Sequence, residues 1–400
     1  MNSGSQSPKV FVAIVTCVLV MIVVYMSQGN EMMRLRAPPK ETRNEFAIST
    51  SVVKGNPTKA RLNVILLTHM SSGSTLVGNM FNLHPDVFYI YEPLNTLRRD
   101  INTNEWRALE KPSNDAYRQD FSTLLRDLFT CGFDEERTIE LAFPDWARPF
   151  NAWDNSSAPL TKESLRKACD ERKITVTKIM QTRLPREGGI RELEKLCRSD
   201  PSTFDCFIVH QVRDPRAVLS SLISNHFYSL EPGAEVSTET PEGIKLLKEN
   251  AQMLCTLVSE NLDHVHAEWL NWFKIRYLLV RYEDIISNLS KEVSEIFKYF
   301  GLPVVDVVTN WINGIPPPGM KAARYYAMVI SRNDTTTTEK WRFNVNISLV
   351  SLFEEVCSPL RAKTGYILVN HSGNLQNNES IPLQTADIPF LRGLNDQELT

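Results

Sequence analysis

The chain has 400 residues, of which 42% are hydrophobic and 23% are charged. This composition is typical of a globular protein and excludes disorder, collagen or a coiled coil for the chain as a whole. The formal net charge of −3 gives no strong positive field, so we expect no nucleic acid as a partner, although a local basic cleft could still hold a small anion.

An uncharged apolar run covers residues 10–26, VFVAIVTCVLVMIVVYM. As a helix it would span about 25 Å, close to the thickness of a bilayer core. The alternative is a cleaved signal peptide, but such peptides have apolar regions of about 7–15 residues and a small-residue cleavage site, which is not evident here. We therefore predict a cytosolic tail over 1–9 and a transmembrane signal anchor over 10–26.

The side of the membrane is decided by sequons, because the basic residues that flank the run are balanced. All six Asn-x-Ser/Thr sequons follow the run, which favours a luminal body and a glycoprotein. The candidate glycosylation sites are Asn155, Asn288, Asn333, Asn346, Asn370 and Asn378.

Six of the seven cysteines follow the run, and an oxidising compartment could pair them all. Cys197 and Cys206 are the most plausible local pair, while the other connectivities stay open. Buried free thiols in a cytosolic enzyme are the alternative. No cysteine or histidine spacing indicates zinc, and we expect no metal.

A polar stem is predicted over 27–60, followed by one enlarged α/β domain over 61–370 and an extended or mobile tail over 371–400. Runs rich in Val and Ile at 62–69, 87–91, 174–180, 206–212 and 277–282 alternate with helical patterns, which include 117–129 and 243–273. This alternation predicts a parallel sheet flanked by helices on both faces.

The turn SSGST at 71–75 joins the first strand to a helix. Small residues before a helix N-terminus leave backbone N–H groups and hydroxyls for a phosphate or sulfate, and Gly73 permits close approach. A lysine beside Gly73 would be needed for a Walker A loop, so a nucleotide-dependent kinase is disfavoured. The alternative is a plain serine-capped helix start.

Arg213 ends the strand 206–212, and Ser221 follows within a helix that begins near Pro215. An arginine at the carboxyl end of a parallel strand lies on the edge where ligands bind, and its planar fork suits a phosphate monoester. A surface ion pair of Asp214 with Arg213 or Arg216 is the alternative.

The sequences HMSSGSTLVGNMFNLHPDVFYIYEPL and VHQVRDPRAVLSS, in this order, resemble the two 3′-phosphoadenylyl sulfate (PAPS) signatures of the Golgi carbohydrate 6-O-sulfotransferases. YLLVRYEDI at 277–285 and KWRF at 340–343 extend the resemblance over 62–366. It implies the P-loop-like PAPS-dependent sulfotransferase fold and a single luminal domain in a single-pass type II Golgi membrane protein. It also implies PAPS as co-substrate and a glycan or glycosaminoglycan as acceptor, with galactose, N-acetylglucosamine or N-acetylgalactosamine as the sugar.

By this resemblance the first loop holds the 5′-phosphosulfate, Arg213 and Ser221 hold the 3′-phosphate, and a later mobile loop closes over the donor. Trp341 of that later loop is alternatively a core residue. The implied donor-binding residues are His69, Met70, Ser71, Ser72, Gly73, Ser74, Thr75, Arg213, Ser221, Lys340, Trp341 and Arg342.

Sulfuryl transfer to a hydroxyl is an in-line displacement that needs a base and a stabiliser of the developing charge. Glu92 directly follows the strand 87–91 and is the predicted base. Its alternative role is to cap the turn made by Pro93.

One position departs from the family pattern, because Ser71 stands where the family has an arginine before the small-residue turn. His69, Lys178, Arg183 or Arg342 could supply the missing cation. Lys178 is the predicted catalytic cation, since the end of a neighbouring parallel strand points to the same edge. An exposed strand-end charge is its alternative, and a member of the family that binds donor or glycan without transfer is the alternative function.

Overall fold

The computed structural model describes residues 60–101, 115–145, 147–154, 158–224, 238–316, 338–369 and 383–391. All of them belong to one unit defined by its internal contacts. The predicted cytosolic tail, the anchor and the stem up to residue 59 lie outside these residues. Among the described helices, none is both long enough and apolar enough to cross a membrane.

A parallel sheet lies at the centre, as predicted, with the strand order β2-β3-β1-β4-β5. Its residues are mostly buried because helices cover both faces, which explains the continuous apolar runs in the sequence. The strands are β1 (Arg61–Thr68), β2 (Val87–Tyr91), β3 (Ile174–Met180), β4 (Phe204–Val212) and β5 (Tyr277–Arg281).

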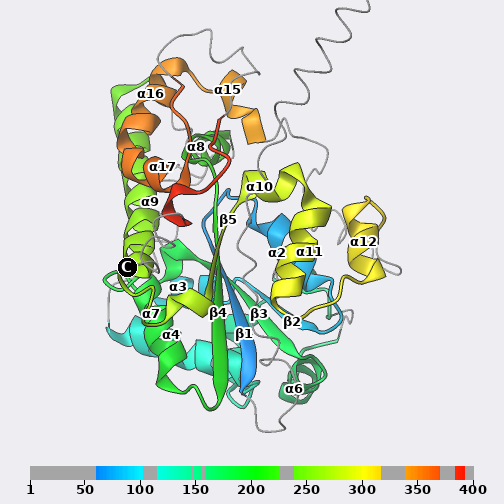
Figure 1. The fold of residues 1–400 in the computed structure, drawn as a ribbon. Helices are drawn as coiled ribbons and strands as arrows, with labels where there is room; N and C mark the ends of the chain where they lie inside the picture. Colours follow the sequence, from blue (N-terminus) through cyan, green and yellow to red (C-terminus); the bar gives the residue numbers. More distant parts are fainter. Residues whose placement is uncertain are drawn as a thin grey trace, which may run out of the picture. The chain divides into compact units, whose positions relative to one another are not determined.

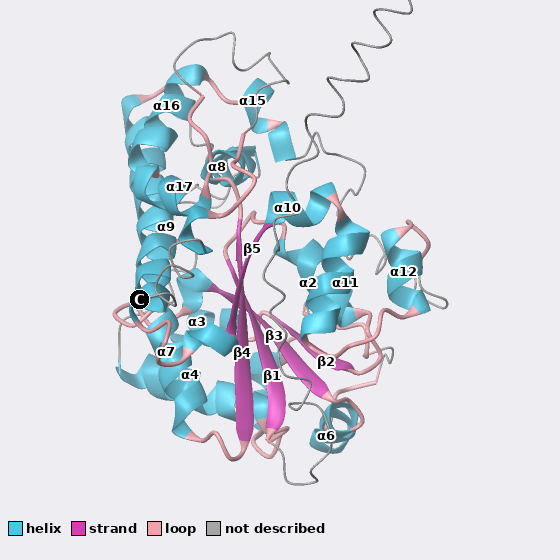
Figure 2. Ribbon diagram, viewed as in Figure 1, coloured by secondary structure: helices cyan, strands magenta, loops and turns pink. Residues whose placement is uncertain are grey.

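Helices form a layer on each side of this sheet (Figures 1 and 2). One layer contains α2 (Ser74–Asn82), α11 (Leu289–Tyr299) and α12 (Asp306–Ile312), whose apolar side chains pack on Val64 and Leu66 of β1. The opposite layer packs on Ile65 and Leu67 and includes α4 (Asp115–Phe129), α7 (Ile190–Ser199), α8 (Pro215–Ser224), α9 (Pro241–Ala267) and α16 (Ile347–Val356). The remaining named α-helices are α3 (Leu94–Ile101), α5 (Glu136–Ala142), α6 (Lys162–Asp170), α10 (Tyr282–Ser287), α15 (Trp341–Asn344) and α17 (Ser358–Thr364).

The strand order creates a switch point between β1 and β4. The chain leaves β1 toward β2 and β3 on one side and later crosses to β4 and β5 on the other. In open α/β sheets, ligands bind outside the carboxyl ends of the strands at such a point. The loop 69–73 follows β1 and Arg213 follows β4, so the topology places both predicted donor-binding segments at the switch point.

Three disulfides pair the six cysteines that follow the apolar run: Cys131–Cys169, Cys197–Cys206 and Cys255–Cys357. The predicted local pair is therefore present. Part of the predicted tail is also folded, since residues 383–391 bury Ile388 and Phe390 against the domain core. That segment belongs to the folded domain and is not extended away from it.

Candidate active site

Hydrogen bonds from the hydroxyls of Thr68 and Ser72 and from Gln211 of β4 fix the loop after β1. The Oγ atoms of Thr68 and Ser72 lie 2.6 Å apart, and Ser72 Oγ donates to the His69 carbonyl at 2.7 Å. Gln211 Nε2 donates to the Ser72 carbonyl at 2.7 Å. The Ser72 hydroxyl thus shapes the loop, while the N-terminus of α2 begins directly after Gly73.

Backbone strain gathers at this edge of the sheet. Gly73 has a φ of 79°, and a Cβ there would collide with the Tyr282 ring, so the position requires glycine. Ser71 and Glu92 have φ values of 59° and 50°, which are uncommon for residues other than glycine. Such conformations persist where the surrounding structure enforces them, and they are frequent at functional sites.

Lys178 and Glu92 meet beside this loop. The Lys178 Nζ atom lies 3.0 Å from Glu92 Oε1, 3.2 Å from Thr75 Oγ1 and 4.4 Å from the centre of the Tyr91 ring. Arg183 Nη1 lies 2.6 Å from the other Glu92 oxygen. Only 1% of the Lys178 side chain is exposed, so an exposed strand-end charge is excluded. The Glu92 side chain is likewise engaged with two cations and does not serve mainly to cap a turn.

These contacts set the charge states. Burial alone would raise the pKa of Glu92, but Lys178 and Arg183 outweigh it and hold the pKa at about 2. Burial lowers the pKa of Lys178, and Glu92 opposes that effect. Burial also lowers the pKa of His69 to about 4, so this side chain is neutral near pH 7 and is not the missing cation.

Arg213 lies across the loop from Lys178. Its Nη1 donates to the Ser71 carbonyl at 2.8 Å, and its guanidinium lies 4.7 Å from the centre of the Tyr282 ring. The predicted pair of Arg216 with Asp214 exists at 2.7 Å, but it is buried and not on the surface. Ser221 lies partly exposed on α8.

The residues 340–342 separate into two environments. Lys340 is exposed, whereas Trp341 and Arg342 are 1% and 0% exposed. The Trp341 ring lies 4.3 Å from the Arg216 guanidinium, and Arg342 Nη1 donates to Glu339 at 2.9 Å. Trp341 is thus a core residue here, which was the alternative interpretation. Its burial and that of Arg342 do not favour their predicted contact with the donor in this conformation. The first half of the TTTTEK segment, residues 335–337, lies outside the described residues.

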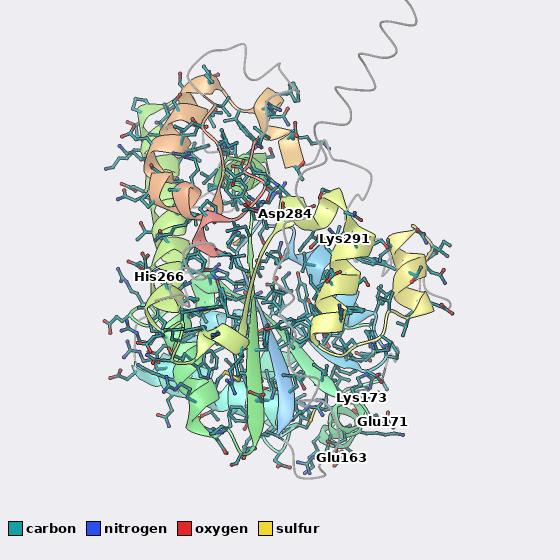
Figure 3. All side chains as sticks on the ribbon, in the orientation of Figure 1. Glu163, Glu171, Lys173, His266, Asp284 and Lys291 are labelled. Carbon is teal, nitrogen blue, oxygen red and sulfur yellow. A yellow bond between two sulfur atoms is a disulfide. The ribbon has the colours of Figure 1, made fainter. Side chains whose placement is uncertain are left out.

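Sequence reasoning missed the role of β5 and α10. Tyr282 contacts Gly73 and Arg213 together, and Glu283 accepts from the Asp214 N–H at 3.0 Å. The available signal was the position of YED directly after a buried strand. Asp284 marks this carboxyl end of the sheet in Figure 3, while Glu163, Glu171 and Lys173 lie at the opposite end around α6.

Two of the six sequon asparagines, Asn288 and Asn346, are described. Both are exposed, and their side chains cap the N-termini of α11 and α16. The other four, Asn155, Asn333, Asn370 and Asn378, lie outside the described residues. Within the described residues, no group of three or more His, Cys, Asp or Glu side chains is arranged to hold a metal ion.

Comparison with known proteins agrees with this geometry. The family model described as a sulfotransferase domain matches residues 62–364. The chain belongs to the sulfotransferase family. It is 28% identical to carbohydrate sulfotransferase 1 of Mus musculus, with 83% of this chain and 86% of the relative covered. It is 26% identical to carbohydrate sulfotransferase 6 of Homo sapiens, covering 84% and 87%, and 25% identical to carbohydrate sulfotransferase 3 of Rattus norvegicus, covering 85% and 75%. The family match makes the chain a sulfotransferase, and the relatives named here are carbohydrate sulfotransferases.

Proposed function

We propose that the protein transfers the sulfuryl group of PAPS to the 6-hydroxyl of galactose, N-acetylglucosamine or N-acetylgalactosamine in a glycan or glycosaminoglycan. One observation carries this proposal: a buried lysine and a buried glutamate meet 3.0 Å apart beside a small-residue loop at the switch point. An acid–base pair next to an anion-binding helix start is what sulfuryl transfer to a hydroxyl requires.

The residues at the switch point fit the donor. The left-handed Gly73 lets the backbone approach a phosphate closely, and the N-terminus of α2 favours negative charge. Arg213 offers a planar fork for the 3′-phosphate from the adjacent strand. When bound, PAPS supplies the sulfuryl group, and the chain's own residues bind it, align it and move the acceptor's proton.

Lys178 supplies the positive charge that the family's arginine provides at the position of Ser71. Its ammonium contacts Thr75 of the loop, so it lies where negative charge develops on the leaving phosphate. A buried ammonium stabilises such charge more than an exposed one, because water screens it less. Glu92 accepts the proton of the acceptor hydroxyl through Oε1, while Arg183 holds Oε2 in place.

Donor binding tunes this base. With Lys178 and Arg183 both on the carboxylate, a pKa of about 2 makes Glu92 a weak base. The donor gives Lys178 a second anion to neutralise, which weakens its pull on Glu92 and raises the pKa of Glu92 toward a useful range. Glu92 thus becomes a better base once the donor is bound.

The proposed setting is the Golgi membrane, with the enzyme domain in the lumen behind the anchor 10–26. The three disulfides fit an oxidising compartment. Exposed Asn288 and Asn346 are available for glycosylation there.

The test uses the full-length protein in detergent, labelled PAPS and a panel of galactose- and hexosamine-bearing glycans. Glu92→Gln should abolish transfer, since the base acts in the chemical step. It should bind adenosine 3′,5′-bisphosphate at least as tightly as the unmodified protein, because Lys178 no longer divides its charge between Glu92 and the nucleotide. Exposed Glu163→Gln at the far end of the sheet is the matched control (Figure 3). Undiminished activity of Glu92→Gln removes Glu92 from the base role.

The same panel tests the binding-only alternative that Ser71 raises. Bisphosphate binding without transfer to any acceptor would support it, and a large gain from Ser71→Arg would show that the site lacks a cation. We expect Ser71→Arg to change kcat by less than about threefold, because Lys178 already lies at the loop.

A further inference from the structure

Glu283 joins two parts of the chain that are distant in sequence. At the first turn of α10, its Oε1 accepts the Asp214 backbone N–H at 3.0 Å, and its Oε2 accepts the Tyr366 hydroxyl at 2.8 Å. Burial raises the pKa of Glu283, with Asp214 adding to the effect and Arg213 opposing it. The proposed reaction assigns no step to the Glu283 carboxyl. Its role therefore follows from its two hydrogen-bond partners, the Asp214 N–H and the Tyr366 hydroxyl.

Glu283 holds the turn that presents Arg213. Asp214 directly follows Arg213, and its carboxylate accepts hydrogen bonds from the Arg216 guanidinium at 2.7 and 2.9 Å. The backbone N–H of Asp214 donates to Glu283. The neighbour of Glu283, Tyr282, lies under the Arg213 guanidinium. Two consecutive residues of α10 therefore fix the backbone after Arg213 and the side chain of Arg213.

The other oxygen of Glu283 leads to the C-terminal segment. Tyr366 is 2% exposed and forms a β-bridge with Gln384. Gln384 Nε2 donates to Asp284 at 2.9 Å, and Arg281 Nη2 donates to the Thr385 carbonyl at 3.0 Å. The folded segment 383–391 thus supports the side of α10 on which Glu283 and Tyr366 meet.

We infer that Glu283 is a positioning residue for donor recognition: supported by Tyr366, it fixes the turn at Asp214 so that Arg213 meets the 3′-phosphate of the donor. This inference rests on the proposed role of Arg213. It predicts a defect specific to the 3′-phosphate and not a general loss of nucleotide binding.

The experiment compares two nucleotides on the full-length protein by calorimetry: adenosine 3′,5′-bisphosphate and adenosine 5′-monophosphate, which lacks the 3′-phosphate. Glu283→Ala should lower the preference for the bisphosphate at least about tenfold and change monophosphate affinity less than about twofold. Glu283→Gln keeps an oxygen acceptor for the Asp214 N–H and should stay within about threefold of the unmodified protein. Exposed Glu295→Ala on the next helix is the control.

Arg213→Ala separates this inference from the proposed function. If Arg213→Ala keeps the preference, the assignment of Arg213 is wrong and the inference falls with it. If Arg213→Ala loses the preference for the bisphosphate and folded Glu283→Ala keeps it, only the inference about Glu283 is overturned. An equal loss of affinity for both nucleotides in Glu283→Ala overturns it as well. Should Glu283→Ala fail to fold, Tyr366→Phe decides: a drop of about threefold supports the inference, and an unchanged preference overturns it.

Discussion

Lys178 illustrates what a single residue's position in the chain can and cannot reveal. Parallel pairing sets it opposite Leu66 of β1 and Tyr91 of β2, which follows from strand order. Its burial follows from the side chains that surround it: Tyr91 ends β2, Glu92 directly follows that strand, and Thr75 lies in α2. Burying the Lys178 ammonium costs free energy of hydration, which one carboxylate and one hydroxyl only partly restore. We assign this buried charge the function of stabilising the leaving phosphate.

Removing the ammonium tests this assignment. Lys178→Met should lower kcat by about 10²- to 10³-fold, the range found when one stabilising donor of a transition-state oxyanion is lost. Lys173→Met is the matched control, because Lys173 is exposed and pairs with Asp86 just before the same strand. Steady-state kinetics with saturating acceptor measures the effect, and equal activity in the two variants would contradict the role of Lys178.

Two buried histidines, His69 of the loop and His210 of β4, predict acid sensitivity. Burial lowers the pKa of His69 from 6.5 to about 4 and that of His210 to about 3. Between pH 6.5 and 4 the unfolded chain binds protons that the folded chain does not, so the free energy of unfolding falls as the pH falls. Glu92 adds to this loss only below its ordinary pKa of 4.5, because its folded pKa is about 2.

Urea unfolding at pH 7 and pH 5 checks this prediction. His210→Gln cannot titrate, so its midpoint should fall less between the two pH values than that of the unmodified protein. Exposed His266→Gln, at the end of α9 in Figure 3, should keep the full pH dependence. If the midpoint of His210→Gln falls between pH 7 and pH 5 as much as that of the unmodified protein, another group controls acid stability.

At the scale of elements, the C-terminal segment contributes more than its composition indicates. The polar stretch HSGNLQNNES hid the apolar residues that follow it, and the contacts of Arg281 with the carbonyls of Thr364, Thr385 and Ala386 cannot be read from a side-chain pattern. Backbone carbonyls carry no sequence signal, so only the folded chain shows where they lie.

Deleting residues 383–400 should therefore destabilise the domain. Loss of buried Ile388 and Phe390 alone corresponds to about 3–6 kcal/mol, at about 1.5–3 kcal/mol for each side chain. A chain that ends at Leu391 keeps these contacts and is the control. Thermal unfolding measures the difference, and equal melting temperatures for the two chains would show that the segment is dispensable.

At the scale of the whole molecule, the disulfides tie distant elements together. Cys255–Cys357 spans 102 residues and joins α9 to the end of α16, whereas Cys197–Cys206 spans 9 residues. Because cross-links restrict the unfolded chain more when the loop is longer, the two bonds should not contribute equally.

Replacing both cysteines of each bond with alanine tests this order. Loss of Cys255–Cys357 should lower the free energy of unfolding by about 4.7 kcal/mol, and loss of Cys197–Cys206 by about 2.6 kcal/mol. Urea unfolding at neutral pH provides the measurement. A larger loss for the short loop would mean that local packing around Cys197 outweighs the restriction of the unfolded chain.

The strands and the α/β class could be predicted from sequence because they depend on local features, and features of the same kind led to the candidate donor loops. Apolar runs of strand length mark buried parallel strands, and a small-residue turn marks a helix start that can bind an anion. Glu92 and Lys178 could be proposed because Glu92 directly follows such a strand and Lys178 lies near the end of another. The burial of Trp341 could not, since a tryptophan beside charged residues is equally compatible with a lid.

The parallel α/β sheet, the order of the two predicted donor-binding segments along the chain and the departure at Ser71 thus follow from the sequence. The folded chain was needed to show that Lys178 contacts Glu92 and Thr75 and that Arg183 completes this cluster. It was also needed to show that α10 and the C-terminal segment hold the Arg213 turn. The physical reason is that these contacts join residues far apart in the chain, and side-chain and backbone partners of this kind exist only once the sheet and its helices have packed.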